Sequence, residues 1–233
     1  MKNAYKQFGY FYDEVMAGLD YQAWADFVTP YLKKGDKILD LACGTGTLLT
    51  ILKFKGYECV GLDLSDSIIE IANEKKKVNR IDIPFYVGDM RDFKLGEKFN
   101  VITCFFDSVN FLKTKRDIDS MLNSVSHHLT DGGYFICDIF SKALMSEYEN
   151  SVIDEDYETF KINWTTKKID SNTLKHVIKI KDVDEEFNES YFEYYHEIKD
   201  LFHKDFNVIK LSGDFNSDLE NDDERILIVM QKK

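Results

Sequence analysis

The sequence predicts an α/β protein. We expect a doubly wound, Rossmann-like seven-stranded sheet with an antiparallel C-terminal hairpin, and a small antiparallel β insertion that covers the active site. Short apolar segments alternate with amphipathic helical segments as far as Cys137, as in parallel sheets covered by helices. A glycine turn follows the first apolar segment directly, and the pattern changes to period two between residues 156 and 195.

The predicted parallel strands are short and largely apolar. The first surrounds Leu39, and the next are residues 59–62, 83–87, 101–106 and 134–137. Because both faces of such strands are apolar, we expect helices on both sides of the sheet. Right-handed crossovers then place the ligand site at the carboxyl ends of the strands.

The sequence between these strands predicts helices. Residues 47–54 form the first, after the glycine turn, and Ser65 is the expected N-cap of the second. Thr114 begins a capping box for the third, which is expected to include Leu129. A turn over residues 131–133 then leads into the fifth strand.

The C-terminal part breaks this alternation. Apolar and polar residues alternate after Phe160 and again from Leu174 to Ile180, and residues 190–195 are expected to join the same antiparallel sheet. A short helix over residues 197–204 and two last strands, residues 208–211 and 226–230, complete the prediction. We therefore divide the chain into a main domain, residues 1–145 and 197–233 with an N-terminal helical cap over 1–30, and an inserted cover, residues 146–196.

Composition limits the class of partner. A formal net charge of −12 argues against a nucleic-acid substrate, because that affinity depends on lysines and arginines that neutralise phosphates. The chain has no apolar run long enough to span a bilayer and no apolar N-terminal stretch of the signal-peptide kind. We expect a cytoplasmic monomer or homodimer without membrane contact, acting on a small molecule. The four cysteines are expected to be buried thiols, with no metal site.

The glycine turn predicts an adenosine cofactor. Gly44 and Gly46 allow a sharp turn and the close approach of a ligand, and Asp63 ends the next strand, where it can accept hydrogen bonds from two ribose hydroxyls. Asp40, just before the turn, would repel a pyrophosphate, and Leu49 stands where a dinucleotide fingerprint has its third glycine. A cofactor that carries an ammonium and a sulfonium suits this carboxylate.

These residues resemble the class I S-adenosylmethionine-dependent methyltransferases. Their first motif, D-x-x-C-G-T-G, is matched by residues 40–46, and residues 88–91 and 104–110 look like the family's adenine-side and fourth-strand motifs. The resemblance implies that Asp40 and the backbone of Gly44, Thr45 and Gly46 hold the methionine end, Asp63 the ribose, and Asp89 with Met90 the adenine of S-adenosyl-L-methionine. Ala42, Cys43, Leu64 and Phe105 are expected in the same site.

The N-terminal segment is rich in aromatic residues. It resembles the cap of small-molecule methyltransferases, including the amino-sugar N-methyltransferases, and this resemblance implies that Tyr12, Tyr21 and Trp24 close over the cofactor. An aromatic face attracts a sulfonium, and phenol hydroxyls can bind a carboxylate. An equally open alternative is a pair of amphipathic helices that pack on the main domain.

The predicted reaction is direct displacement of the methyl group by an N or O atom of a small acceptor. Asp107, just after the fourth strand, and His196, after the cover, are the candidate catalytic residues that orient or deprotonate the acceptor. For Asp107 a structural role in a turn, and for His196 a packing role, are the alternatives. The fourth-strand motif departs from the N-P-P-Y type of enzymes acting on amide or base nitrogens.

Two other functions remain open at this stage. An NAD(P)-dependent oxidoreductase would account for the glycine turn and Asp63, but it leaves Asp40, Leu49 and the terminal hairpin unexplained. A non-catalytic module that binds S-adenosylmethionine is also compatible with the sequence, because methyl transfer has no obligatory set of catalytic side chains.

Overall fold

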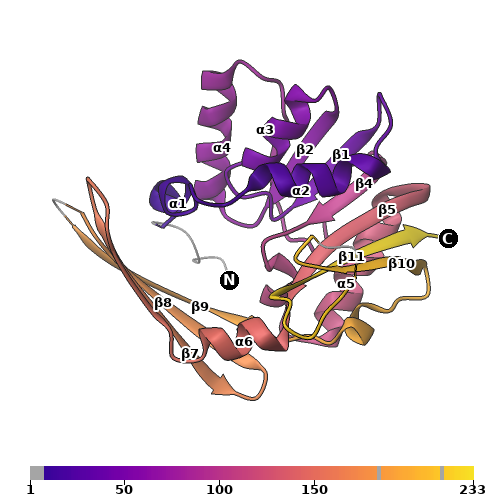
Figure 1. Ribbon diagram of the computed structural model, residues 1–233. Helices are drawn as coiled ribbons and strands as arrows, with labels where there is room; N and C mark the ends of the chain where they lie inside the picture. Colours follow the sequence, from indigo (N-terminus) through magenta and orange to yellow (C-terminus); the bar gives the residue numbers. More distant parts are fainter. Residues whose placement is uncertain (1–7, 183–184, 216–217) are drawn as a thin grey trace.

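The computed structural model describes residues 8–182, 185–215 and 218–233. The predicted cap, cover and last hairpin therefore extend over a few residues, 1–7, 183–184 and 216–217, that lie outside the described ones. The larger sheet has the strand order β10-β11-β5-β4-β1-β2-β3 (Figure 1). Its strands are β1 (Lys37–Leu41), β2 (Glu58–Asp63), β3 (Phe85–Val87), β4 (Phe99–Cys104), β5 (Leu129–Phe140), β10 (Phe206–Gly213) and β11 (Arg225–Lys232).

The expected seven-stranded sheet and its C-terminal hairpin are confirmed. Strands β1 to β5 pair in parallel, whereas β11 runs antiparallel to both β5 and β10. Because the parallel strands share one direction, their carboxyl ends meet at one edge of the sheet, where a doubly wound fold binds its ligands.

Helices cover both faces of this sheet. The helices of the described residues are α1 (Gly9–Val15), α2 (Tyr21–Val28), α3 (Thr47–Phe54), α4 (Asp66–Asn79), α5 (Lys115–His128) and α6 (Lys142–Tyr148), with short 3-10 helices η1 (Thr29–Tyr31), η2 (Ser108–Phe111) and η3 (Ile198–Leu201). One core packs α5 against the sheet, and a second core on the opposite face packs α2, α3 and α4 against it. The N-caps Ser65 and Thr114 accept the predicted backbone hydrogen bonds, and Thr114 forms the capping box with Asp117.

Several boundaries differ from the prediction. Helix α5 ends at His128, so Leu129 belongs to β5, and the predicted turn at residues 131–133 lies inside that strand. The pairing with β4 skips there from Leu129 to Tyr134, so the intervening residues form a bulge rather than a separate turn. The predicted helix over residues 197–204 is the four-residue η3. Helix α6 and strand β6 carried no recognised signal in the sequence.

The inserted sheet has the order β6-β7-β8-β9 and is antiparallel throughout. Its strands are β6 (Val152–Asp156), β7 (Lys161–Asp170), β8 (Thr173–Lys181) and β9 (Glu186–Tyr194). As the period-two pattern predicts, one face is buried: Ile178 and Ile180 pack with Phe160 and with Phe8, beside α1. Figure 1 shows this cover sheet standing apart from the main sheet, with α1 above it and α6 at its lower end.

All four cysteines are buried free thiols, as expected. Burial raises the pKa of Cys59 to about 12, which keeps this thiol protonated and unreactive. None of the helices in the described part of the chain is long and apolar enough to cross a membrane.

Candidate active site

The glycine turn joins β1 to α3 through an unusual backbone. Ala42, Gly44 and Gly46 all have positive φ angles, of 54°, 55° and 80°. A Cβ atom on Gly46 would lie 2.6 Å from the Phe85 ring, so this position excludes any larger residue. The turn therefore stays close to the ends of β2 and β3 and leaves space above the sheet.

Asp63 joins this turn to the end of β2. Its Oδ2 accepts a hydrogen bond from the Gly44 N–H at 3.0 Å, and its Oδ1 accepts one from the Ser65 N–H at 2.9 Å. Burial raises the pKa of Asp63, and these backbone donors oppose that shift. A carboxylate has about four acceptor positions, so Asp63 keeps capacity for a ligand hydroxyl.

Asp40 is a second buried carboxyl group beside the turn. Thr103 Oγ1 donates to its Oδ1 at 2.6 Å, and burial raises the pKa of Asp40 to about 7. Asp63 contributes to this shift through its negative charge. Two acids with little exposure to water favour a cationic ligand, whose charge would offset their own.

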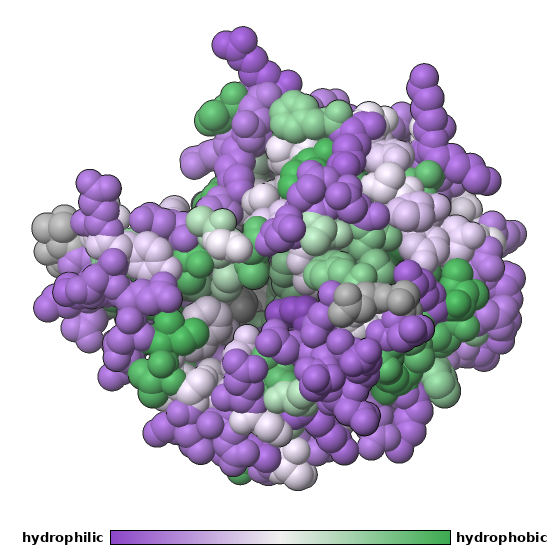
Figure 2. All heavy atoms as spheres, in the orientation of Figure 1, coloured by the Kyte–Doolittle hydropathy of each residue, from purple (hydrophilic) through white to green (hydrophobic). Residues whose placement is uncertain are grey.

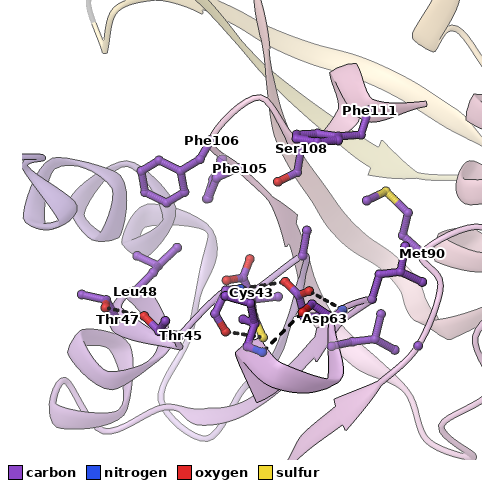
Figure 3. A pocket seen from close by; sticks show the side chains of 18 of the residues that line it. Cys43, Thr45, Thr47, Leu48, Asp63, Met90, Phe105, Phe106, Ser108 and Phe111 are labelled. Atoms are coloured by element: carbon purple, nitrogen blue, oxygen red, sulfur yellow. Dashed lines mark hydrogen bonds between the residues drawn. The ribbon is translucent and has the colours of Figure 1, made fainter. Parts of the chain in front are cut away.

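A cavity opens above these acids at the carboxyl edge of the sheet. Including its open mouth, it encloses about 1160 Å³. Figure 3 shows Asp63 and Cys43 on its floor, Phe105, Phe106 and Ser108 across from them, and Met90 at one side. The lining is mainly apolar, with a few polar groups that converge on it, which is the usual character of a small-molecule site.

Most of the predicted cofactor residues line this cavity. They are Tyr12, Tyr21, Asp40, Ala42, Cys43, Gly44, Thr45, Asp63, Leu64, Asp89, Met90 and Phe105. Gly46 and Trp24 are not among the lining residues. Gly46 shapes the turn, and the Trp24 indole packs on Phe105 and Phe106, with ring centroids 4.8 and 4.5 Å away, so it supports the wall from behind.

Sequence reasoning missed part of the lining. The missed residues are Thr47, Leu48, Leu62, Ser65, Ile68, Gly88, Phe106, Ser108, Phe111 and Leu112. Gly88, Phe106 and Ser108 lie inside the motifs at residues 88–91 and 104–110, and most of the others flank a predicted residue in the sequence. Phe111 and Leu112 come from η2 and its end, and their place in the wall depends on how this loop folds back.

Two of the predicted residues that line the cavity, Asp89 and Tyr21, have shifted pKa values. Arg91 donates to both carboxylate oxygens of Asp89, and this hydrogen bonding lowers the pKa of Asp89. Burial raises the pKa of Tyr21 to about 12, so its phenol stays protonated and can donate. The cavity thus offers a hydrogen-bond donor from the N-terminal cap and acceptors from the sheet.

Asp107 lies beside the cavity and outside its lining. It precedes η2 in a left-handed conformation (φ 60°), and its Oδ1 accepts a hydrogen bond from Arg225 Nη1 at 2.6 Å. The same nitrogen donates to Asp138 Oδ2 at 2.8 Å. Burial raises the pKa of both carboxyl groups, to about 7 for Asp138. This buried ion triad was not predicted from the sequence, because its members are far apart along the chain.

His196 has a different place from the one expected. Its side chain is buried outside the cavity lining, and Nε2 lies 2.7 Å from the Leu112 carbonyl oxygen. Because a carbonyl accepts only, Nε2 must carry the proton. Burial lowers the pKa of His196, which keeps the ring neutral. This contact holds the end of η2 and is compatible with the packing role, and the catalytic role of His196 stays a prediction.

The cavity fits an adenosine that carries a positive charge. Asp63 can accept from a ribose hydroxyl, Met90 and Ile68 offer apolar contact to a base, and Asp40 faces the space beside the turn. A pyrophosphate would have to lie against the two acids, which electrostatics disfavours.

Comparison with known proteins agrees with this geometry. The methyltransferase domain family matches residues 32–198. A crystal structure of an S-adenosylmethionine-dependent methyltransferase from Clostridium acetobutylicum has a TM-score of 0.85 and 28% sequence identity, covering 99% of both chains. The chain belongs to the methyltransferase domain family and is an S-adenosylmethionine-dependent enzyme.

Two curated relatives extend the comparison. A protein of Geobacillus sp. (strain WCH70), assigned to the methyltransferases, is 25% identical over 98% of this chain and 99% of its own length. The dTDP-3-amino-3,4,6-trideoxy-alpha-D-glucopyranose N,N-dimethyltransferase of Streptomyces venezuelae is 35% identical over 51% of this chain and 50% of its own. The first spans the whole chain, and the second is a relative whose name specifies an amine acceptor.

Proposed function

We propose that this enzyme transfers a methyl group from S-adenosylmethionine to an amine nitrogen of a small molecule. The observation that supports this proposal most is the cavity at the strand ends, where Asp40 is buried, Asp63 is half-buried, and Ser108 and Phe111 line the opposite side. Relatives named for N,N-dimethylation of amino sugars support nitrogen over oxygen. The net charge of −12 supports a small molecule over a nucleic acid.

When bound, S-adenosylmethionine supplies a methyl group that is already activated by its sulfonium. The residues of this chain then have to bind, orient and exclude water. Asp63 and Asp40 hold the polar parts, Tyr12 and Tyr21 close the N-terminal side, and the aromatic wall at Phe105 limits the access of water. Holding the acceptor in line can contribute roughly 7–11 kcal/mol.

An extract assay tests this function. The protein is incubated with metabolite extracts and S-adenosylmethionine carrying an isotopically labelled methyl group, and labelled products are identified by mass spectrometry. We expect a small molecule labelled on an amine nitrogen. A product labelled on oxygen would overturn the assignment to nitrogen, and the absence of any labelled product would favour binding without turnover.

Replacing Asp63 tests the cofactor site. Asp63→Ala should weaken S-adenosylmethionine binding by about 1–3 kcal/mol, because ligand hydroxyls and the N–H of Gly44 lose their acceptor. Isothermal titration calorimetry measures this change. Asp131→Ala is the control, because its carboxylate is almost fully exposed near the start of β5, away from the carboxyl ends of the strands. Asp63→Asn keeps one acceptor oxygen and should lose less, and unchanged binding in both variants would remove Asp63 from the site.

A further inference from the structure

The cavity wall that follows β4 carries a single polar side chain among the described residues. This wall consists of Phe105, Phe106, Ser108, Phe111 and Leu112. Ser108 begins η2 and is 9% exposed, and Figure 3 shows its Oγ pointing into the cavity, with Phe106 on one side and Phe111 on the other. The hydroxyl has no hydrogen-bond partner in the part of the chain that the structure describes. It is therefore available to a ligand.

Ser108 differs in this respect from the rest of the lining. The other hydroxyl groups that line the cavity all have hydrogen-bond partners within the chain: Tyr12, Tyr21, Thr45, Thr47 and Ser65. These other hydroxyls lie on the N-terminal cap, the glycine turn and the start of α4. Because a free hydroxyl in an apolar wall gains most from a ligand with a polar atom, Ser108 is the candidate contact for the acceptor.

An unfavourable backbone conformation brings this hydroxyl to the cavity. Phe106 and Asp107 are two consecutive residues with left-handed φ angles, of 58° and 60°, a region that side chains disfavour. The turn directs Phe106 and Ser108 to the cavity, whereas Asp107 lies outside the lining and accepts a hydrogen bond from Arg225. The Asp107 N–H also donates to Asp138 Oδ2 at 3.2 Å. The ion triad thus holds the chain just before Ser108.

The far end of η2 is held as well. Asn110 is fully buried, its Nδ2 donates to the Tyr194 carbonyl at 2.9 Å, and its Oδ1 accepts from the Phe140 N–H at 3.2 Å. The contact between His196 Nε2 and the Leu112 carbonyl follows directly. Because η2 is attached on both sides of its first residue, the Ser108 hydroxyl needs no rearrangement to meet a ligand.

The aromatic rings beside the hydroxyl are supported from behind. Phe106 packs on Trp24 and Tyr21, with ring centroids 4.5 and 5.0 Å apart, and Phe111 stacks on Tyr191 of the cover sheet at 5.3 Å. Figure 2 shows the molecule hollowed between the cover sheet and the main sheet. This side of the cavity is therefore an apolar wall with one fixed hydrogen-bonding group, which suits an uncharged molecule that presents one N–H.

We infer that the Ser108 hydroxyl accepts a hydrogen bond from an N–H of the neutral acceptor amine and so fixes the direction of the nitrogen electron pair. This inference rests on the proposed function. The nitrogen uses its electron pair to form the new C–N bond, and the C–S bond of the methyl donor breaks with its pair on sulfur. The proton of the resulting ammonium passes to water when the product leaves. Ser108 itself neither gains nor loses a proton.

This contact defines the class of acceptor. A primary or a secondary amine in its neutral form has both an electron pair for the methyl group and an N–H for Ser108. A neutral tertiary amine has no N–H, and its protonated form has no electron pair. Methylation should therefore stop at the tertiary amine, without formation of a quaternary ammonium.

A binding experiment tests the contact without turnover. Isotopically labelled protein, saturated with S-adenosylhomocysteine, is titrated with aniline, N-methylaniline or N,N-dimethylaniline, while NMR follows the amide signals of η2. These probes are uncharged at neutral pH and carry two, one and no N–H. Ser108→Ala should weaken the binding of the first two by roughly tenfold and leave that of the third unchanged. Ser146→Ala, an exposed serine on α6 outside the lining, is the control and should behave as the wild type.

A kinetic experiment uses the amine found in the extract assay. Ser108→Ala and Ser108→Cys should each lower kcat/KM for this amine by roughly tenfold, because its N–H loses a good acceptor. A thiol fills the space of the hydroxyl but accepts hydrogen bonds weakly, so an equal loss in both variants separates hydrogen bonding from packing. Binding of S-adenosylmethionine should be unchanged in both, and mass spectrometry of the wild-type products should show no quaternary ammonium.

The outcomes separate this inference from the proposed function. The role of Ser108 would be overturned, and methyl transfer left intact, if aniline failed to bind the wild type, if Ser108→Ala changed the affinity for all three anilines equally or for none, or if Ser108→Cys kept the wild-type kcat/KM. A product labelled on oxygen would overturn the nitrogen acceptor, whereas the NMR titration would still report whether Ser108 binds an N–H. Unchanged cofactor affinity in the Ser108 variants excludes misfolding as the cause of a loss.

Discussion

Asp40 is a buried acid that lines the cavity. The residue lies within β1, 4% exposed, and the Thr103 hydroxyl on β4 donates to its side chain. Burial raises the pKa of Asp40 to about 7, so its charge changes within the physiological range. A cationic ligand should lower this pKa again by favouring the carboxylate.

Cofactor affinity should therefore depend on pH. Below pH 7 Asp40 is mostly protonated in the free protein, and a cation must displace that proton, so affinity should fall as the pH falls from 8 to 6. Well below the pKa the loss approaches about tenfold per pH unit. Calorimetry with S-adenosylmethionine at pH 6, 7 and 8 measures it. At low pH, where Asp40 is protonated, the wild type and Asp40→Asn should bind the cofactor with the same affinity. A wild-type affinity that is independent of pH would contradict the prediction.

The residues of the glycine turn could be predicted from sequence because their demands are local. A left-handed backbone requires glycine at Gly46, and an acid at the end of β2 is adjacent to that turn in any doubly wound sheet. The partner of His196 could not be predicted, because the Leu112 carbonyl is 84 positions away in the sequence.

At the scale of elements, the buried ion triad joins the ends of three strands. Asp107 follows β4, Asp138 lies in β5 and Arg225 begins β11, and the guanidinium also lies 5.7 Å from the Trp24 ring. The two carboxylates hold Arg225 in place, and the arginine in turn fixes the start of η2 beside the cavity. This contact explains why the C-terminal hairpin matters for a site built mainly by the first half of the chain.

Removal of the arginine should unfold the protein more easily. Arg225→Met leaves Asp107 and Asp138 buried without their cation, which typically costs about 3–5 kcal/mol of unfolding free energy. The loss should be larger at pH 8 than at pH 5, because both carboxyl groups can take up protons at the lower pH. Urea denaturation at both pH values measures it. Lys161→Met, which breaks an exposed ion pair with Asp156, is the control and should change stability by less than about 1 kcal/mol.

Elements with a repeating sequence pattern could be predicted, whereas elements whose limits depend on pairing with other strands could not. The capped helices α4 and α5 begin where Ser65 and Thr114 indicate. The bulge of β5 at residues 131–133 reads locally as a turn, because two glycines follow an aspartate. Pairing with β4 at Leu129 and again from Tyr134 on makes these residues a bulge within the strand, and such pairing depends on segments far away in the sequence.

At the scale of the whole molecule, α1 connects the cofactor site to the cover. Asp13 accepts a hydrogen bond from the Thr45 hydroxyl at 2.6 Å and pairs with Lys75 Nζ on α4 at 2.6 Å. On the other side of the helix, Phe11 packs on Phe160 of the cover sheet, with centroids 4.6 Å apart. Helix α1 is therefore attached both to the glycine turn of the cavity and to the cover sheet, so the positions of these two parts are linked.

Loosening this connection should weaken cofactor binding with little effect on global stability. Asp13→Ala removes a partly exposed ion pair and the hydrogen bond to Thr45, so we expect a loss of about 1 kcal/mol, roughly fivefold in the dissociation constant. Calorimetry measures the affinity and thermal unfolding the stability. Glu14→Ala, an exposed neighbour on the same helix, should leave both unchanged. If Asp13→Ala and Glu14→Ala bound the cofactor equally well, the contacts of Asp13 would make no contribution to cofactor affinity.

The sequence by itself determined the sheet, its order of elements and the chemistry of the cofactor end. Alternating apolar segments, the glycine turn, Asp40 and Asp63 carry that information locally, because each acts within one strand, one turn or one helix start. These signals need no knowledge of distant contacts.

Only the tertiary structure decided the acceptor side. Arg225 reaches Asp107 across 118 positions, and Asn110 of η2 donates to the Tyr194 carbonyl of β9, 84 positions away. The physical reason is that charge burial and pairing depend on which segments the folded chain brings together, and spacing along the sequence does not encode this.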